Sequence, residues 1–145
     1  MKRMIVAALA LAGVFVALYL TLYKLGAIGQ LACTVGSCER VNSSQWATFL
    51  GAPVAVWGLV FYVVLFAVAF VGTTPQYAVR RAVSVTLTAM SLTGVLFSGW
   101  LTWLELFVIH AICQYCVVSA CIVTLIFLTS VADLLSTKSA AQSRY

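Results

Sequence analysis

Five cysteines are the side chains of this chain best suited to chemistry, and four of them stand in two close pairs. They are Cys33, Cys38, Cys113, Cys116 and Cys121. In the first pair, Gly36 lets the chain reverse, so the two sulfurs can meet in a small ring. Such a pair exchanges disulfides when a thiolate attacks a disulfide sulfur. The spacing therefore predicts thiol–disulfide exchange.

The second pair is expected at the start of a helix. Cys113 and Cys116 are three residues apart and share one helical face, and a helix N-terminus lowers the pKa of a thiol. Cys121 lies about 140° further around the same helix and is predicted to be a small core residue. At a membrane surface, the nearest hydrophobic electron acceptor for this pair is a lipid-soluble quinone.

Three other interpretations of the cysteines remain open. The pairs would be static disulfides if they only stapled the fold, although stapling is typical of small secreted domains. They would bind zinc as a four-cysteine site, although the spacings fit loosely and an oxidising compartment opposes it; we expect no metal. In the third interpretation the C-x-x-C is fortuitous.

The composition excludes an ordinary soluble domain. Hydrophobic residues make up 64% of the 145 residues and charged ones 8%, with a mean hydropathy of +1.13, whereas soluble domains have about 45–50% apolar and about 25% charged residues. A disordered chain would be poor in apolar residues. The net charge of +5 comes from eight basic residues, too few to predict a nucleic-acid partner.

The elements that position the cysteines must be membrane helices. Charge-free stretches predict an all-α, polytopic membrane protein with four transmembrane helices, at about 4–24, 54–72, 82–108 and 112–134. Between 82 and 132 the only charged or imidazole side chains are Glu105 and His110, which mark a turn because the stretch is too long for one crossing. A single domain, 1–145, is expected, with an outer loop at 25–53 and a flexible tail at 136–145.

A short interfacial helix is predicted at residues 43–50 of the outer loop. Trp46, Phe49 and Leu50 recur at i, i+3 and i+4, which gives one apolar face, and Gly51 and Pro53 end it. This helix would anchor the loop at the membrane, cover a quinone pocket, or do both.

The distribution of lysine and arginine predicts the orientation. Six fall at one end of the predicted bundle and two at the other: Lys2, Arg3, Arg80, Arg81, Lys138 and Arg144 against Lys24 and Arg40. Both termini are thus expected in the cytoplasm, with the chain in the cell membrane and both cysteine pairs on its oxidising outer face. A cleaved signal peptide is the alternative for the first segment, but its apolar run exceeds the usual length.

Three segments resemble the vitamin K epoxide reductase family. CTVGSCERVNSSQW, from Cys33, is similar to that family's first loop; GAPVAVWG, from Gly51, to the start of its second helix in prokaryotic members; and ELFVIHAICQYC, from Glu105, to the end of its third helix with its C-x-x-C. The similarity covers nearly the whole chain in order. It implies an oxidoreductase that acts on thiols, with a quinone such as ubiquinone or menaquinone as the acceptor.

The resemblance also implies a path for electrons. Cys33 would exchange with a thioredoxin-like disulfide oxidase, which is expected to be a separate chain. Cys38 would pass electrons to Cys113 through a transient disulfide, and Cys116 would lie next to the quinone ring. The implied activity reoxidises the partner and so supports disulfide-bond formation.

A quinone site is implied as well. Its candidate residues are Ser44, Trp46, Val54, Trp57, Phe61, Tyr62, Glu105 and His110. Ser44 would orient the loop or quinone, or else cap a helix, and the aromatic side chains of the second helix would line the site or fill the bundle core. Glu105 and His110 would move protons for quinone reduction, or else stand solvated at the interface.

The chain departs from the vertebrate members of that family at two positions. Val54 and Ala120 stand where those enzymes have an asparagine and a tyrosine that belong to vitamin K epoxide recognition, which favours simple quinone reduction. Vitamin K epoxide reduction itself, a redox-sensing membrane subunit without turnover, and a small transporter with incidental cysteines are the alternative functions.

Overall fold

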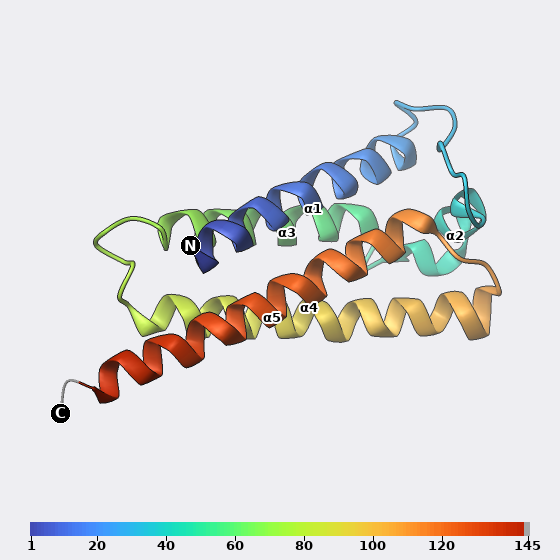
Figure 1. Cartoon of the computed structure of the whole chain (residues 1–145). Coiled ribbons are helices and arrows are strands. Elements are labelled where there is room, and N and C mark those ends of the chain that lie inside the picture. The colour runs from blue at the N-terminus through green and yellow to red at the C-terminus, as the bar shows by residue number, and fades with distance from the viewer. Residues whose placement is uncertain (144–145) are drawn as a thin grey trace.

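A computed structural model describes residues 1–143, which form a bundle of four long helices with a small capping subdomain at one end (Figure 1). The elements, in chain order, are α1 (Lys2–Lys24), α2 (Cys38–Ser43), η1 (Gln45–Ala47), β1 (Thr48–Phe49), β2 (Ala52–Pro53), α3 (Val54–Val71), α4 (Arg81–Leu104), η2 (Glu105–Ile109) and α5 (Gln114–Gln142). Both termini and the α3–α4 connection lie at one end, here called the terminal end. The segments 25–53 and 110–113 lie at the other, the loop end.

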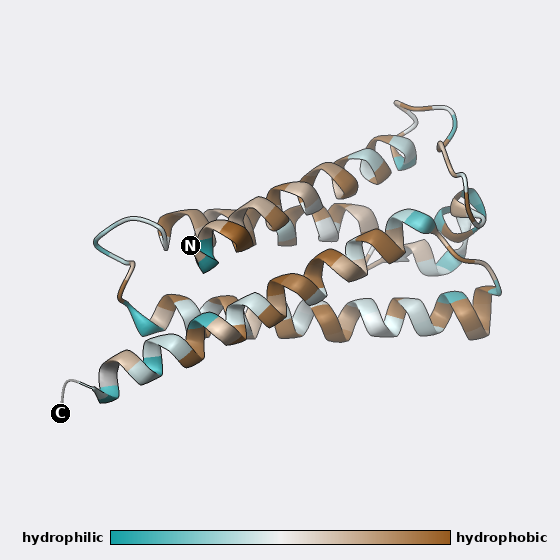
Figure 2. Cartoon of the chain, in the orientation of Figure 1, coloured by the Kyte–Doolittle hydropathy of each residue, from teal (hydrophilic) through white to brown (hydrophobic). Residues whose placement is uncertain are grey.

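Four helical stretches are long and apolar enough to span a membrane: Lys2–Lys24, Val54–Val71, Arg81–Ile109 and Gln114–Ala140. Apolar residues run along all four (Figure 2), and large ones such as Phe15, Phe70 and Leu128 stay exposed on the outside of the bundle. Exposed apolar surface of this extent is typical of helices that face lipid. The predicted all-α, polytopic membrane fold is confirmed.

Small residues let the helices approach one another. Helix α1 packs mainly against α3 and α5, and α4 packs against α5, whereas α3 and α4 touch little. A methyl group on Gly13 of α1 would lie 2.4 Å from the Tyr62 ring of α3, and one on Gly94 of α4 would lie 2.6 Å from Phe61. Close approach at small residues is how membrane helices gain van der Waals contact.

The terminal end is held by one arginine. Arg3 is 6% exposed, and its guanidinium makes five hydrogen bonds at 2.8–3.3 Å, one for each N–H that it carries. The acceptors are Asp133 Oδ2, Ser84 Oγ and the carbonyl oxygens of Gly72, Tyr77 and Arg80. One side chain therefore ties α1 to the α3–α4 connection, α4 and α5.

The short helix of the outer loop lies earlier than predicted. It spans Cys38–Ser43, and the predicted helix at 43–50 is wrong because Ser44 takes an extended conformation. A 3₁₀ turn and a two-stranded hairpin follow, with Thr48 opposite Pro53. Leu50 and Gly51 both have positive φ, 52° and 81°, as a two-residue hairpin turn of type I′ requires.

Helix α5 continues to Gln142 instead of ending near residue 134. The predicted tail is thus helical through Gln142, because neither glycine nor proline interrupts the sequence there. Residues 144–145 lie outside the described part of the chain. At the other turn, α4 runs into one turn of π-helix that ends at Ile109, close to the predicted 108.

Candidate redox site at the loop end

The first cysteine pair forms a disulfide, Cys33–Cys38, whose Cα atoms are 6.1 Å apart. Gly36 has a φ of +87°, so the reversal expected from a glycine at this place is confirmed. Cys33 is partly exposed, whereas Cys38, at the start of α2, is 1% exposed. A thiol arriving from water therefore meets the Cys33 sulfur first.

This disulfide loop is docked on the segment that leads into α5. Gly36 pairs with Cys113 as an isolated antiparallel bridge, and the backbone N–H of Ser37 donates to the carbonyl oxygen of Ile112 at 2.8 Å. A Cβ on Gly36 would lie only 2.2 Å from that oxygen, so no other residue fits. Both cysteine pairs thus lie at the same end of the bundle, as predicted.

The second pair opens α5 as predicted, with free thiols on Cys113 and Cys116. Cys113 is the N-cap residue and has no exposed surface. The pKa of its thiol is lowered to about 7, because the Cys116 thiol and the backbone N–H groups of Cys116 and Tyr115 donate hydrogen bonds to the thiolate, although burial and the Glu105 carboxylate oppose this. Cys113 is therefore poised to act as a thiolate.

Cys38 and Cys113 share one buried cluster at the loop end. The side-chain amide of Asn42, which is 9% exposed, donates to the carbonyl oxygen of Cys38 at 2.9 Å and to the sulfur of Cys113 at 3.7 Å. Lys24 in turn donates to the Asn42 carbonyl oxygen at 2.7 Å. One residue of α2 thus contacts a member of each pair.

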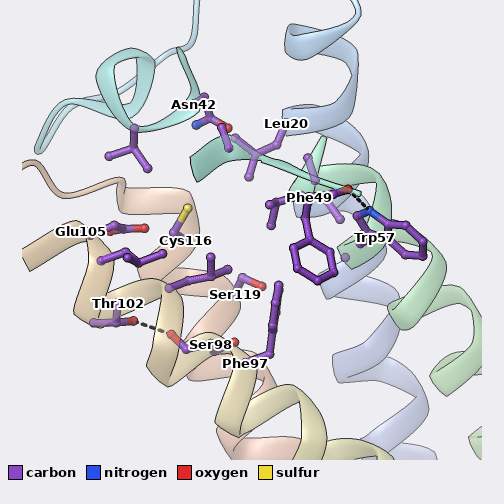
Figure 3. A pocket seen from close by; sticks show the side chains of 18 of the residues that line it. Leu20, Asn42, Phe49, Trp57, Phe97, Ser98, Thr102, Glu105, Cys116 and Ser119 are labelled. Atoms are coloured by element: carbon purple, nitrogen blue, oxygen red, sulfur yellow. Dashed lines mark hydrogen bonds between the residues drawn. The ribbon is translucent and has the colours of Figure 1, made fainter. Parts of the chain in front are cut away.

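Glu105 is brought to the second pair by the π-helical turn. Its side chain is 4% exposed, its Oε2 accepts a hydrogen bond from the backbone N–H of Cys113 at 3.2 Å, and its carboxyl group points toward the Cys116 sulfur (Figure 3). A buried carboxyl group beside a thiol can exchange protons with it. The interpretation of Glu105 as merely solvated at the interface is therefore wrong.

A half-open cavity of about 340 Å³ lies beside Cys116, lined by residues of all four long helices and of the segment 41–49. Of the sequence-predicted residues, it is lined by Ser44, Trp46, Val54, Trp57, Phe61, Tyr62, Glu105 and Cys116. Its volume falls within the range of small-molecule pockets, about 300–1,000 Å³. The lining is mostly apolar and aromatic, with a few polar groups near Cys116 (Figure 3).

Several hydrogen bonds fix the walls of this cavity. The Trp57 indole N–H donates to the carbonyl oxygen of Phe49 at 2.9 Å and holds the hairpin over α3. The Tyr62 hydroxyl forms hydrogen bonds with two oxygens of Ser119 on α5, the backbone carbonyl oxygen at 2.9 Å and the side-chain hydroxyl oxygen at 2.8 Å. The Ser44 hydroxyl donates to the carbonyl oxygen of Val41 at 2.7 Å, so it terminates α2 while facing the cavity.

Two of the singled-out residues lie elsewhere. His110 does not line the cavity: it is exposed in the turn after η2, where it takes a left-handed conformation with φ 54°. Cys121 is exposed on α5, so its prediction as a core residue is wrong. The rotation of about 140° from Cys116 carries it to the outer, lipid-facing side of the helix.

The sequence analysis missed part of the site. The missed lining residues that approach the polar end are Asn42, Phe97, Ser98, Thr102 and Ser119. Those on α4 could have been found by stepping back from Glu105 in helical turns, because residues three, four, seven and eight positions apart share a face.

The chain matches the sequence model of the Vitamin K epoxide reductase family over residues 4–131. The matched region contains α1 from Met4 onward, all of α3 and α4, α5 up to Val131, both cysteine pairs and every residue named above as lining the cavity.

Proposed function

This chain belongs to the vitamin K epoxide reductase family, and from this premise we propose that it is a quinone-dependent thiol oxidoreductase that reoxidises a separate thioredoxin-like protein. One observation carries the proposal. An oxidised, water-accessible disulfide is docked on a second cysteine pair, and one sulfur of that second pair lies on the wall of an apolar cavity.

The first exchange takes place at Cys33. A partner thiolate attacks the Cys33 sulfur, forms a mixed disulfide with it and releases the Cys38 thiolate. The partner's second thiolate then attacks the partner's first sulfur in this mixed disulfide and releases the Cys33 thiolate. The partner leaves oxidised, and the loop pair is left with two thiols. The difference in exposure between Cys33 and Cys38 supports this order of attack.

The second exchange joins the pairs. The Cys38 thiolate attacks Cys113 in a Cys113–Cys116 disulfide and releases the Cys116 thiolate; Cys33 then attacks Cys38, which re-forms the loop disulfide and releases Cys113. A thiol of low pKa is a good leaving group, so the lowered pKa of Cys113 favours its release in the second half of this exchange. The products are an oxidised loop pair and a reduced helix pair, the same redox state as in the structure.

The last step returns the helix pair to a disulfide. A quinone bound in the cavity would accept two electrons and two protons and leave as the quinol. Glu105 holds the start of α5 through the Cys113 N–H and is placed to take the proton of Cys116 as its sulfur is oxidised. Trp57, Phe61 and Phe97 supply flat apolar surfaces for a ring of the ubiquinone or menaquinone class.

The lining also bears on the choice of oxidant. Val54 offers only an apolar side chain at the cavity, so it cannot donate a hydrogen bond to an epoxide oxygen. The lack of a donor at this position favours quinone reduction over epoxide reduction. We place it in the cell membrane with both termini in the cytoplasm and the loop end outside, on the charge distribution described above.

The test is quinone reduction by the purified protein with a reduced thioredoxin-like protein as the electron donor. Wild type is expected to consume ubiquinone or menaquinone catalytically, and Cys116→Ala to abolish turnover. Cys121→Ala, a cysteine on the same helix that faces outward, is the matched control and should keep full activity. Glu105→Gln retains an oxygen for the Cys113 N–H and is expected to slow turnover about a hundredfold.

Two results would contradict the proposal. Absence of quinone consumption by wild type with either quinone would leave only a sensing or structural role for the cysteines. Equal loss of activity in Cys116→Ala and Cys121→Ala would remove Cys116 from the position next to the oxidant.

A further inference from the structure

Gln114, one of the two residues between the helix cysteines, has no role in the exchange steps above, yet its side chain accepts three hydrogen bonds from the disulfide loop. We propose that Gln114 is a positioning residue that holds the Cys33–Cys38 loop in register over Cys113. Its part in turnover rests on the proposed function, whereas its part in bringing the two pairs together does not.

Three donors converge on the side-chain oxygen of Gln114. They are the backbone N–H of Thr34 at 3.1 Å, the hydroxyl of Thr34 at 2.9 Å and the backbone N–H of Val35 at 3.1 Å. Both residues lie inside the disulfide ring. The backbone of the ring is also tied to this segment by the Ser37 N–H bond to Ile112, so side-chain and backbone contacts hold opposite parts of the same loop.

The chemistry of the contact explains the residue type. All three bonds use the acceptor oxygen of the amide, so the site needs an acceptor with the reach of a glutamine side chain. A glutamate has the same length and an oxygen that accepts as well or better. A leucine has nearly the same bulk and no acceptor, and an asparagine has the acceptor on a shorter stem.

The location gives the contact a consequence for exchange. Gln114 follows Cys113 directly and begins α5, so a loop held by its side chain is fixed relative to the sulfur that must be attacked. Exchange between two sulfurs depends on how often they meet in the right geometry, which is an effective concentration. Losing the three bonds leaves the loop attached but free to swing away from Cys113.

The effective concentration can be measured with two cysteines alone. A chain with Cys33→Ala, Cys116→Ala and Cys121→Ala retains Cys38 and Cys113. One oxidised glutathione converts these two thiols into the Cys38–Cys113 disulfide and yields two reduced glutathiones. The square of the reduced glutathione concentration, divided by the oxidised glutathione concentration at half-conversion, therefore reports the effective concentration. Mass spectrometry after acid quenching counts the disulfide.

In this background, Gln114→Leu is expected to lower the effective concentration about tenfold, since each neutral hydrogen bond contributes modestly against water. Gln114→Glu is expected to stay within about threefold of the parent, because the acceptor is restored. Gln114→Asn should fall between them and tests the same contact without added apolar surface. Gln30→Leu, an exposed glutamine of the same loop end, is the matched control and should change nothing.

The outcomes separate the inference from its rivals. A Gln114→Leu value equal to that of Gln30→Leu would overturn it, and so would an equal fall in Gln114→Leu and Gln114→Glu, which would mean that packing and not acceptance matters. No quinone or partner protein takes part in this measurement. The effective concentration can therefore be interpreted even if the proposed function is wrong. In the full chain, Gln114→Leu should slow turnover with the partner but not oxidation of the pre-reduced helix pair by quinone.

Discussion

Gly36 has no room for a side chain, and replacing that glycine by alanine should lift the disulfide loop away from the segment that leads into α5. The new Cβ would lie 2.2 Å from the carbonyl oxygen of Ile112, so the loop must retreat by about 1.2 Å to reach ordinary contact. The Ser37 N–H bond to the same oxygen, now 2.8 Å, then stretches beyond hydrogen-bonding distance.

The size of the effect follows from two costs. Holding an alanine at the φ of +87° seen for Gly36 costs about 1–2 kcal/mol, and the lost hydrogen bond costs about 1 kcal/mol. Both costs vanish when the loop opens, so the equilibrium shifts toward the open form by about 2–3 kcal/mol. That shift is an increase of about 30- to 150-fold in the open population.

Alkylation of Cys113 measures this population, because its side chain has no exposed surface while the loop is docked. When the loop closes faster than iodoacetamide reacts, the alkylation rate is proportional to the open fraction. The rate at Cys113, read by tandem mass spectrometry, should therefore rise about 30- to 150-fold in Gly36→Ala.

A second glycine supplies the control. Gly26 has a φ of +80° and no heavy atom within 4 Å of an added Cβ, so Gly26→Ala carries similar backbone strain without the clash. It should leave the Cys113 rate within about twofold of wild type. Equal rates in Gly36→Ala and Gly26→Ala would refute the reasoning, because the loop would then not rest on Ile112 in the working protein.

Two further predictions concern charge. Asp133→Leu removes the carboxylate partner of the buried Arg3 and should lower the free energy of unfolding in detergent by about 3 kcal/mol. Glu39→Leu, at an exposed carboxylate, should have little effect on this free energy. An equal loss of stability in both variants would mean that the ion pair is not formed. The lowered pKa of Cys113, about 7, means that its thiolate forms as the pH rises through 7. The ultraviolet thiolate absorbance of the reduced protein, minus that of Cys113→Ala, should therefore reach half its maximum near pH 7, and a midpoint near 8.5, the ordinary thiol value, would show that the hydrogen bonds to Cys113 are absent.

The membrane helices and the cysteine site could be predicted because their causes are local in sequence. An apolar run of this length predicts a transmembrane helix, and the C-x-x-C spacing places both sulfurs on one turn of a helix. For the aromatic residues of α3, periodicity alone indicated the bundle core; the family resemblance pointed to the site, and Trp57 and Phe61 do line the cavity. The hairpin was missed because Leu50, a residue type that rarely adopts a positive φ, forms half of its turn, so only Gly51 signalled a turn there.

The finer parts of the site depend on partners far apart in the chain. Gln114 contacts residues 79 and 80 positions away, and Asn42 contacts Cys113 from 71 positions away. No spacing rule connects such residues, and a glutamine or an asparagine has many uses in a loop or helix start. The prediction for Cys121 was wrong for a different reason. A small apolar side chain is suited to both lipid and the protein core, so the residue type does not indicate which face of the helix it occupies.

The five bonds of Arg3 also set an order for biosynthesis. Its acceptors emerge from the ribosome long after it does, and the carboxylate of Asp133 comes last. Until α5 is synthesised, the Arg3 guanidinium lacks its carboxylate partner and has to be solvated by interfacial water or lipid headgroups. A chain truncated before residue 133 would be left with an Arg3 guanidinium that lacks its carboxylate partner.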